Sequence, residues 1–291
     1  ESSKTSLFFL LFSSLIYFTC KEYSMKHCLT IAGSDSCGGA GIQADLKAFS
    51  ANGVYGMSVI TAVTAQNTQG VFDVQDINPS VIAHQIEAVM DDIRVDAIKI
   101  GMVSRPETIE IIASTLKKYP LPPLVIDPVM ISKSGYDLLQ PEAKKALIET
   151  LLPMATLITP NLPEAEVIVG YTIDTIELMQ KAAKDLHTLG CQYVLVKGGH
   201  LSDDATDVLY DGKEFYLLNA KRLVSINTHG TGCTLSSAIA ANLAKGLHVK
   251  QAVEEAKAYI TEAIGFGFPL GKGVGPVHHF YKLYKDAGVE Q

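Results

Sequence analysis

The chain has 291 residues, of which 47% are hydrophobic and 19% are charged, and its formal net charge is −7. This length suffices for one large domain or two small ones. A mildly acidic chain without a run of Lys and Arg is a poor general binder of nucleic acids and membrane surfaces, so we expect neither as a partner.

The cysteines and the N-terminal segment favour different cellular locations. Five scattered cysteines without a CxxC pair are typical of a reduced, cytoplasmic chain with neither a disulfide framework nor a zinc knuckle. The apolar run at 6–20 is similar to the core of a signal peptide, but it is shorter than the roughly 20 residues of a membrane span. Because Met25 directly precedes the first expected strand, we favour an N-terminal extension or start-site artefact at 1–24 over a leader.

Strand-like and helix-like segments alternate from residue 26 onward. In the first half, apolar periodicity predicts a strand, a helix, a strand, a helix, a strand, a helix and a strand, at 28–33, 42–53, 57–66, 81–93, 95–101, 106–119 and 123–130. Gly53 closes the first of these helices. The last helix begins with Pro106 and ends in basic residues, which the helix dipole favours.

The same alternation continues in the second half, and two helices close the chain. The pattern predicts a helix, a strand, a helix, a strand, a hairpin and two helices, at 141–152, 155–161, 175–190, 192–199, 207–218, 234–246 and 249–267. The dipeptide Asp211-Gly212 marks the hairpin turn. Repeated β-then-α units predict an α/β fold with a mostly parallel sheet and helices on both faces. Short connections favour a single domain at 25–291.

Polar clusters follow nearly every predicted strand. They lie at 32–45, 65–70, 101–104, 127–135, 159–166, 197–200 and 227–233. In open α/β sheets, ligands bind beyond the carboxyl ends of the strands. The clusters therefore predict one shared site at that edge of the sheet.

The segment from Gly230 through Thr231 and Gly232 to Cys233 leads into a predicted helix. Unpaired N–H groups, the helix dipole and closely approaching glycine backbone make such a segment an anion cradle suited to phosphate. The same field is expected to lower the pKa of the thiol, which would then take a proton from an attacking hydroxyl. The alternative is a small core residue at the start of a tightly packed helix, and the residues alone do not decide between the two.

Three oxygen-bearing residues follow neighbouring predicted strands. Asp127, Asn161 and Glu164 form a hard-oxygen environment for hydrated Mg²⁺ and phosphates, although Asn161 and Glu164 also fit the start of a helix. Lys197 supplies a point charge for a phosphate or is a solvated lysine at a strand end. The histidines at 229, 278 and 279 have no partners at metal-ligand spacing, and we expect structural roles for them.

Two nucleotide-binding motifs can be tested against the chain. The Walker pattern is absent, which argues against a P-loop NTPase. Residues 39–44 match G-x-G-x-x-A, but no acid follows the second predicted strand, as a dinucleotide fold requires. A dinucleotide oxidoreductase is therefore the weakest alternative.

The segments TIAGSDSCGGAGIQAD, VIDPVM, LITPNLPEAE, VLVKGGH and NTHGTGC, together with their order and spacing, resemble the hydroxymethylpyrimidine/phosphomethylpyrimidine kinases of thiamine biosynthesis. The resemblance covers Met25 to about Tyr284. It implies a ribokinase-like fold and a homodimer. It also implies two ATP- and Mg²⁺-dependent phosphorylations, first of 4-amino-5-hydroxymethyl-2-methylpyrimidine and then of its monophosphate.

The resemblance also implies roles for individual residues. Cys233 would be the base, where the wider superfamily has Asp, and Gly230, Thr231 and Gly232 would complete an anion hole with it. The pyrimidine pocket would consist of Gly33, Asp45, Gln66, Met102 and Val129. ATP and phosphates would contact Asp127, Asn161, Glu164, Lys197 and Thr228, with Mg²⁺ held indirectly by Asp127 and Glu164. Residues 131–137 resemble a flap over the site.

Two further functions stay open from the sequence. A pyridoxal kinase of the same branch shares the segment from Gly230 to Cys233, although Gln66 favours the pyrimidine. A non-catalytic pyrimidine-binding protein is a rival of another class, against which the presence of Cys233, Asp127 and Glu164 argues.

Overall fold

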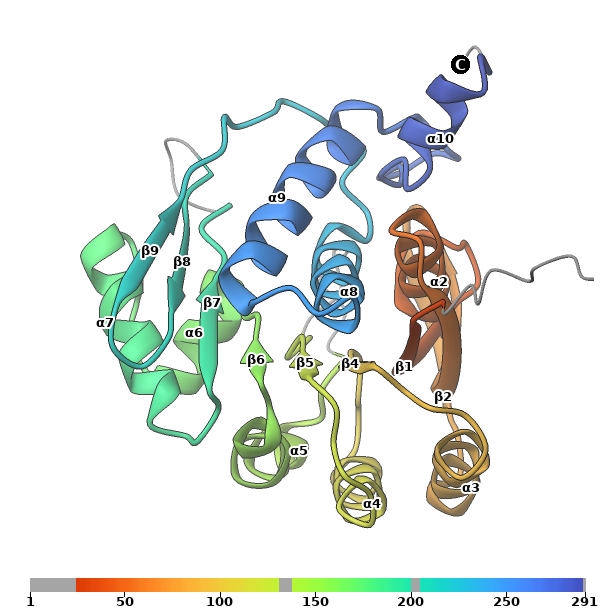
Figure 1. The fold of residues 1–291 in the computed structure, drawn as a ribbon, viewed down its shortest axis with the longest axis vertical. Coiled ribbons are helices and arrows are strands. Elements are labelled where there is room, and N and C mark those ends of the chain that lie inside the picture. Colours follow the sequence, from red (N-terminus) through yellow and green to blue (C-terminus); the bar gives the residue numbers. More distant parts are fainter. Residues whose placement is uncertain (1–24, 131–137, 200–204, 290–291) are drawn as a thin grey trace, which may run out of the picture.

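The computed structural model describes residues 25–130, 138–199 and 205–289. In that part of the chain, nine strands form one sheet in the order β3-β2-β1-β4-β5-β6-β7-β8-β9 (Figure 1). The expected extension at 1–24 and the expected flap at 131–137 lie outside the described residues, so the division of the chain at residue 25 stays a prediction. None of the described helices is both long and apolar enough to cross a membrane.

Six neighbouring strands are parallel, and the antiparallel strands lie toward the two ends of the sheet. The parallel strands are β1 (His27–Asp35), β2 (Tyr55–Asn67), β4 (Ala97–Ile100), β5 (Leu124–Ile126), β6 (Leu157–Ile158) and β7 (Tyr193–Val196). The antiparallel strands are β3 (Gly70–Asp76), β8 (Asp207–Tyr210) and β9 (Phe215–Leu218). The predicted α/β class with a mostly parallel sheet is confirmed.

Helices cover both faces of the sheet (Figure 1). They are α2 (Gly41–Ala51), α3 (Pro79–Met90), α4 (Pro106–Leu116), α5 (Pro141–Ala146), α6 (Leu162–Val169), α7 (Ile176–His187), α8 (Thr231–Ala244), α9 (Val249–Gly265) and α10 (Tyr281–Asp286). Strand alternation divides the core between the faces. On β4, Ile98 and Ile100 pack toward α3 and α4, whereas Ala97 packs toward α8 and α9.

Three local predictions were wrong. Edge strand β3 was not predicted, because it has no buried face and Phe72 is 67% exposed. The chain closes with a third helix, α10, of only six residues. The helix predicted at 141–152 is α-helical only to Ala146 and continues as a π-helix at Leu147–Leu151 and a 3-10 turn at Leu152–Met154.

Candidate active site

The polar segments that follow the parallel strands meet at a cavity of about 810 Å³. All but one of the residues predicted for the site line this cavity. Some of them lie in the glycine-bearing segments at 32–45 and 227–233, at the end of β2 or directly after β4. These are Gly33, Gln66, Met102, Thr228, Gly230, Thr231, Gly232 and Cys233. From the segments after β5, β6 and β7 they are Asp127, Val129, Asn161, Glu164 and Lys197. The exception is Asp45.

One wall of the cavity is the N-terminus of α8. Gly230 caps the helix with a φ of +80°, and a Cβ there would lie 1.7 Å from the carbonyl oxygen of Gly39. Glycine therefore permits both this backbone conformation and the close contact with the loop before α2. The hydroxyl of Thr231 donates to the carbonyl oxygen of Thr228 at 2.8 Å. Since Cys233 is the third helical residue, its N–H belongs to the turn that lacks partners within the helix.

The pKa of the Cys233 thiol differs in direction from the prediction made from the sequence. Burial raises the pKa of Cys233 to about 11, although the ammonium of Lys99 opposes this change. The sequence predicted a lowered pKa from the helix dipole alone. The direction of the change is opposite to the predicted one, and the thiol is protonated in the free protein at neutral pH.

Asp127 and Lys197 form a buried ion pair between the ends of β5 and β7, the two strands on either side of β6. Oδ1 of Asp127 accepts hydrogen bonds from Nζ of Lys197 at 2.8 Å and from the hydroxyl of Thr159 at 3.1 Å. The Lys197 side chain is only 14% exposed, which contradicts the alternative of a solvated lysine. Oδ2 of Asp127 lies 3.4 Å from the point where a Cβ on Gly232 would stand. The pair therefore lies directly opposite the first turn of α8.

Asn161 and Glu164 have the capping role that the sequence offered as one of two readings. The side chain of Asn161 accepts from the N–H of Glu164 at 2.9 Å, and the Glu164 carboxylate accepts from the N–H of Asn161 at 2.8 Å. Both residues also line the cavity, so the capping role is compatible with the predicted contact with phosphates. Burial raises the pKa of Glu164 to about 7, and the charge of Lys197 limits the rise.

Asp45 is buried and does not line the cavity, unlike the other residues predicted for the pyrimidine pocket, so its place there stays a prediction. Its side chain is completely buried, and both carboxylate oxygens lie 2.9 Å from Nζ of Lys99. The hydroxyls of Thr30 and Ser237 donate to the same carboxylate at 2.6 and 2.7 Å. Lys99 itself lines the cavity and was not predicted. A lysine in the middle of an apolar strand was the signal that could have revealed it.

Another part of the cavity wall combines apolar groups with one amide. Gly33 leaves room for Met102, since a Cβ on Gly33 would lie 3.0 Å from the Met102 sulfur. The side-chain oxygen of Gln66 accepts from the hydroxyl of Thr64 at 3.2 Å. The Gln66 amide nitrogen lies 3.5 Å from Nε2 of His229. Such an amide can pair with the polar edge of a flat heterocycle.

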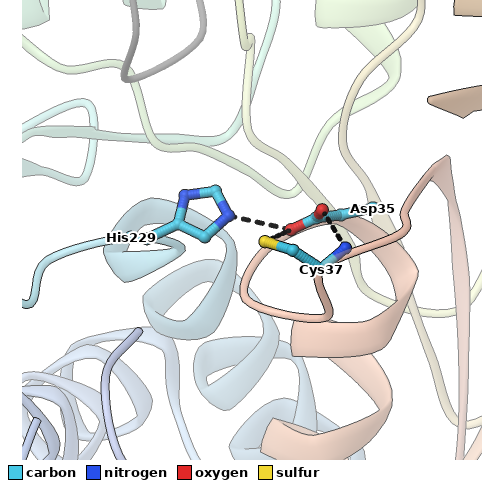
Figure 2. A group of neighbouring side chains, drawn as sticks. All are labelled: Asp35, Cys37 and His229. Carbon is cyan, nitrogen blue, oxygen red and sulfur yellow. Dashed lines mark hydrogen bonds and ion pairs between the residues drawn. The ribbon is translucent and has the colours of Figure 1, made fainter. Parts of the chain in front are cut away.

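His229 has neighbours that sequence spacing did not suggest. Its Nε2 lies 2.8 Å from Oδ2 of Asp35, and Cys37 lies beside them, so residues of metal-ligating type surround His229 in space although none stands at such a spacing in the sequence (Figure 2). Burial alone would raise the pKa of Asp35, but hydrogen bonds from His229 and from the N–H groups of Ala40 and Cys37 lower it to about 2. By contrast, His279 is buried and pairs with the Thr234 hydroxyl at 2.9 Å, in keeping with a structural role.

A family model described as phosphomethylpyrimidine kinase matches residues 35–278. The chain belongs to this family. The resemblance found in the sequence is thus confirmed, and so is the prediction of an enzyme that transfers phosphoryl groups.

Relatives of known name agree with the family assignment. A hydroxymethylpyrimidine/phosphomethylpyrimidine kinase of Rhizobium meliloti is 53% identical over 263 residues, which cover 89% of this chain and 98% of the relative. The crystal structure of a phosphomethylpyrimidine kinase from Clostridium difficile is 55% identical with a TM-score of 0.74, and the match covers 82% of this chain and 99% of that one.

The phosphomethylpyrimidine kinase fold of this chain is also similar to that of a pyridoxal kinase. The Bacillus subtilis enzyme, solved as an ADP complex, is 46% identical with a TM-score of 0.83, and the match covers 88% of this chain and 98% of that one. These likenesses confirm the ribokinase-like architecture expected from the sequence.

Proposed function

We propose that this family member phosphorylates the hydroxymethyl group of 4-amino-5-hydroxymethyl-2-methylpyrimidine and then converts the monophosphate to the pyrophosphate, as a step in thiamine biosynthesis. One observation carries the proposal: a single cavity joins the N-terminus of α8, with Cys233 in its first turn, to a pocket with the Gln66 amide. The names of the relatives, which cover both phosphorylations, support the same substrate.

We propose ATP as the phosphoryl donor, bound near Asn161, Lys197 and Thr228. A pyridoxal kinase of Staphylococcus aureus, 38% identical to this chain, was solved with the ATP analogue AMP-PCP and pyridoxal together. The ammonium of Lys197 offers a positive charge beside the cavity for a phosphate. The N–H groups of the first turn of α8 would donate to the oxygens of the transferred phosphoryl group, where negative charge gathers in the transition state.

The residues at the carboxyl ends of β5 and β6 fit a Mg²⁺ ion held through water. Oδ1 of Asp127 is already occupied by Lys197 and Thr159, whereas Oδ2 has no such partner among the described hydrogen bonds and is directed toward Gly232. Glu164 offers a second carboxylate in the same cavity wall. Carboxylates, water and phosphate oxygens are the ligands that Mg²⁺ prefers. When bound there, the ion would neutralise charge on the phosphates.

Cys233 would accept the proton of the hydroxymethyl group as its oxygen bonds to the γ-phosphorus and the bond to ADP breaks. The raised pKa of the thiol, about 11, makes it a strong base once it is deprotonated and a scarce one at neutral pH. In the second phosphorylation, the attacking oxygen belongs to a phosphate and already carries charge. The base is therefore needed mainly for the first step.

Gln66 would select the pyrimidine, while Gly33, Met102 and Val129 would provide the apolar walls around the ring. Turnover of the 291-residue chain with ATP should be measured with the pyrimidine and with pyridoxal side by side. Preference for the pyrimidine, with monophosphate and then pyrophosphate as products, supports the proposal. Preference for pyridoxal, the second candidate because of the likeness to the Bacillus subtilis enzyme, would contradict it.

Two further aspects extend the proposal. We propose a homodimer. Val63 on β2 and Phe72 on β3 are 46% and 67% exposed, and contact with a second copy of the chain would remove these apolar side chains from water. Sedimentation equilibrium tests this state.

We propose the cytoplasm as the location, where ATP is available, and cell fractionation tests it.

A further inference from the structure

Asp35, Cys37 and His229 form a cluster of three different metal-ligating side chains that the proposed phosphorylation does not use (Figure 2). One carboxylate oxygen, one thiol sulfur and one imidazole nitrogen lie within 4.8 Å of one another. Asp35 ends β1 and Cys37 follows it in the loop before α2, whereas His229 precedes α8. We propose that these side chains bind a divalent transition-metal ion of the zinc class, which would link the loop to the start of α8.

The distances in the cluster are close to those of a tetrahedral site. Zinc bonds of about 2.0–2.2 Å to oxygen and nitrogen and about 2.3 Å to sulfur place the ligand atoms roughly 3.3–3.7 Å apart. Sγ of Cys37 lies 3.5 Å from Oδ2 of Asp35, within this range. Nε2 of His229 lies 2.8 Å from the same oxygen, so metal binding requires a separation larger by about half an ångström.

Backbone N–H groups already fix the orientation of the Asp35 carboxylate, as a metal ligand requires. Oδ1 of Asp35 accepts from the N–H of Cys37 at 2.9 Å, and Oδ2 accepts from the N–H groups of Gly39 and Ala40 at 3.1 and 2.8 Å. Carboxylates that ligate a metal are typically oriented by hydrogen bonds of this kind. A Cβ on Gly39 would lie 2.2 Å from the imidazole ring of His229, so glycine there lets the ring approach the loop.

The exchange is balanced in charge and involves no oxidation. Bonds form from the ion to Sγ, Nε2 and Oδ2 and replace its bonds to water molecules, which leave together with the thiol proton and any proton on Nε2. A sulfur, nitrogen and oxygen donor set with a fourth position for water suits Zn²⁺ or Co²⁺ rather than Mg²⁺. The ion has a path to the cluster, because Asp35 and His229 line the cavity and Cys37 is only half-buried. The site is distinct from the Mg²⁺ position proposed at Asp127.

Titration of the full-length protein with Co²⁺ tests the proposal without using the phosphorylation reaction. We expect a thiolate-to-cobalt absorption band that saturates near one equivalent and disappears when Zn²⁺ is added. Cys37→Ser should abolish the band and weaken binding by at least the roughly 10- to 100-fold that loss of an outer partner costs. Cys233→Ser is the matched control, because Cys233 lines the same cavity but lies outside the cluster, and it should keep the band.

His229→Gln is the second variant, and circular dichroism checks the folding of each variant. We expect His229→Gln to weaken Co²⁺ binding while Cys37 still gives a weaker thiolate band. A wild-type protein without the band would overturn the proposal. So would a folded Cys37→Ser variant that binds Co²⁺ as tightly as the wild type, because the band would then arise from another cysteine.

Discussion

Replacing Asp45 by asparagine tests the finding that this residue stabilises the fold below the cavity. Asp45 and Lys99 are both completely buried, and the carboxylate accepts two hydrogen bonds of 2.9 Å from the ammonium. An asparagine side chain at this position would leave the ammonium without a counter-charge and would direct an N–H₂ group at donors from Thr30 or Ser237. Breaking a buried pair by removing one partner costs about 3–5 kcal/mol. We expect the free energy of unfolding to fall by this amount.

Urea unfolding at pH 7 measures the effect, with an exposed ion pair as the matched control. Lys181 and Asp185 lie 2.8 Å apart on α7, but their side chains are 56% and 44% exposed. We expect Asp185→Asn to cost no more than about 1 kcal/mol. The double variant Asp45→Leu, Lys99→Met should recover much of the lost stability, because it removes both charges together.

Two results would refute this reasoning. One is an Asp45→Asn variant no less stable than the Asp185→Asn control. The other is an Asp45→Asn variant of unchanged stability with a KM for the pyrimidine raised tenfold or more, which would return Asp45 to the pocket that the family resemblance assigned to it.

Three more predictions concern the cavity. Cys233→Ala should slow the first phosphorylation by about 100-fold or more and the second far less, as single-turnover product analysis will measure. In the wild type, the rate of the first step should rise between pH 7 and pH 9.5, because the thiolate fraction grows toward the pKa of about 11, while the second step stays nearly flat. Glu164→Gln should make the protein more stable than the wild type at pH 8 but not at pH 4 in urea unfolding. Burial raises the pKa of Glu164 from 4.5 to about 7, so the folded state holds the proton more tightly. The free energy of unfolding therefore falls by about 3 kcal/mol as the pH rises through this window.

Each of these three predictions has its own control variant and its own contradicting result. Cys191→Ala removes a buried cysteine outside the cavity and should leave the ratio of the two steps unchanged. Equal losses in both steps for Cys233→Ala would contradict a base limited to the hydroxymethyl group. A first step that does not respond to pH would exclude the thiolate as the base. Glu177→Gln, on the exposed first turn of α7, should shift stability equally at both pH values, and the Glu164 argument fails if Glu164→Gln does the same.

The parallel sheet and the cavity were predictable because their signals are local. Each parallel strand is a short apolar run, and each flanking helix has its own apolar period, as in Ile82 and Ile86 on α3. All parallel strands of such a sheet end at the same edge. The polar segments at their ends therefore had to meet, whatever the details of packing. The capping box of Asn161 and Glu164 was local too, since three residues separate its members.

Contacts between distant segments were not predictable in the same way. His229 and Asp35 are 194 positions apart, and Lys99 and Asp45 are 54 apart, so no spacing rule joins them. The direction of the pKa change of Cys233 was missed for a related reason. The helix dipole can be inferred from the sequence around Cys233, but the loss of hydration depends on every segment that packs against the thiol.

Helix α8 connects the buried ion pair of Asp45 and Lys99 to Cys233, the candidate base. Ser237 follows Cys233 by one turn of α8, and its hydroxyl donates to Asp45 at 2.7 Å. The same face of α8 therefore presents the thiol to the cavity and anchors the Asp45 carboxylate below it. Lys99 completes the link, because it pairs with Asp45 and also lowers the pKa of Cys233 against the effect of burial. From this geometry we expect Asp45 to act on the site through Lys99 and α8 rather than by contact with a substrate.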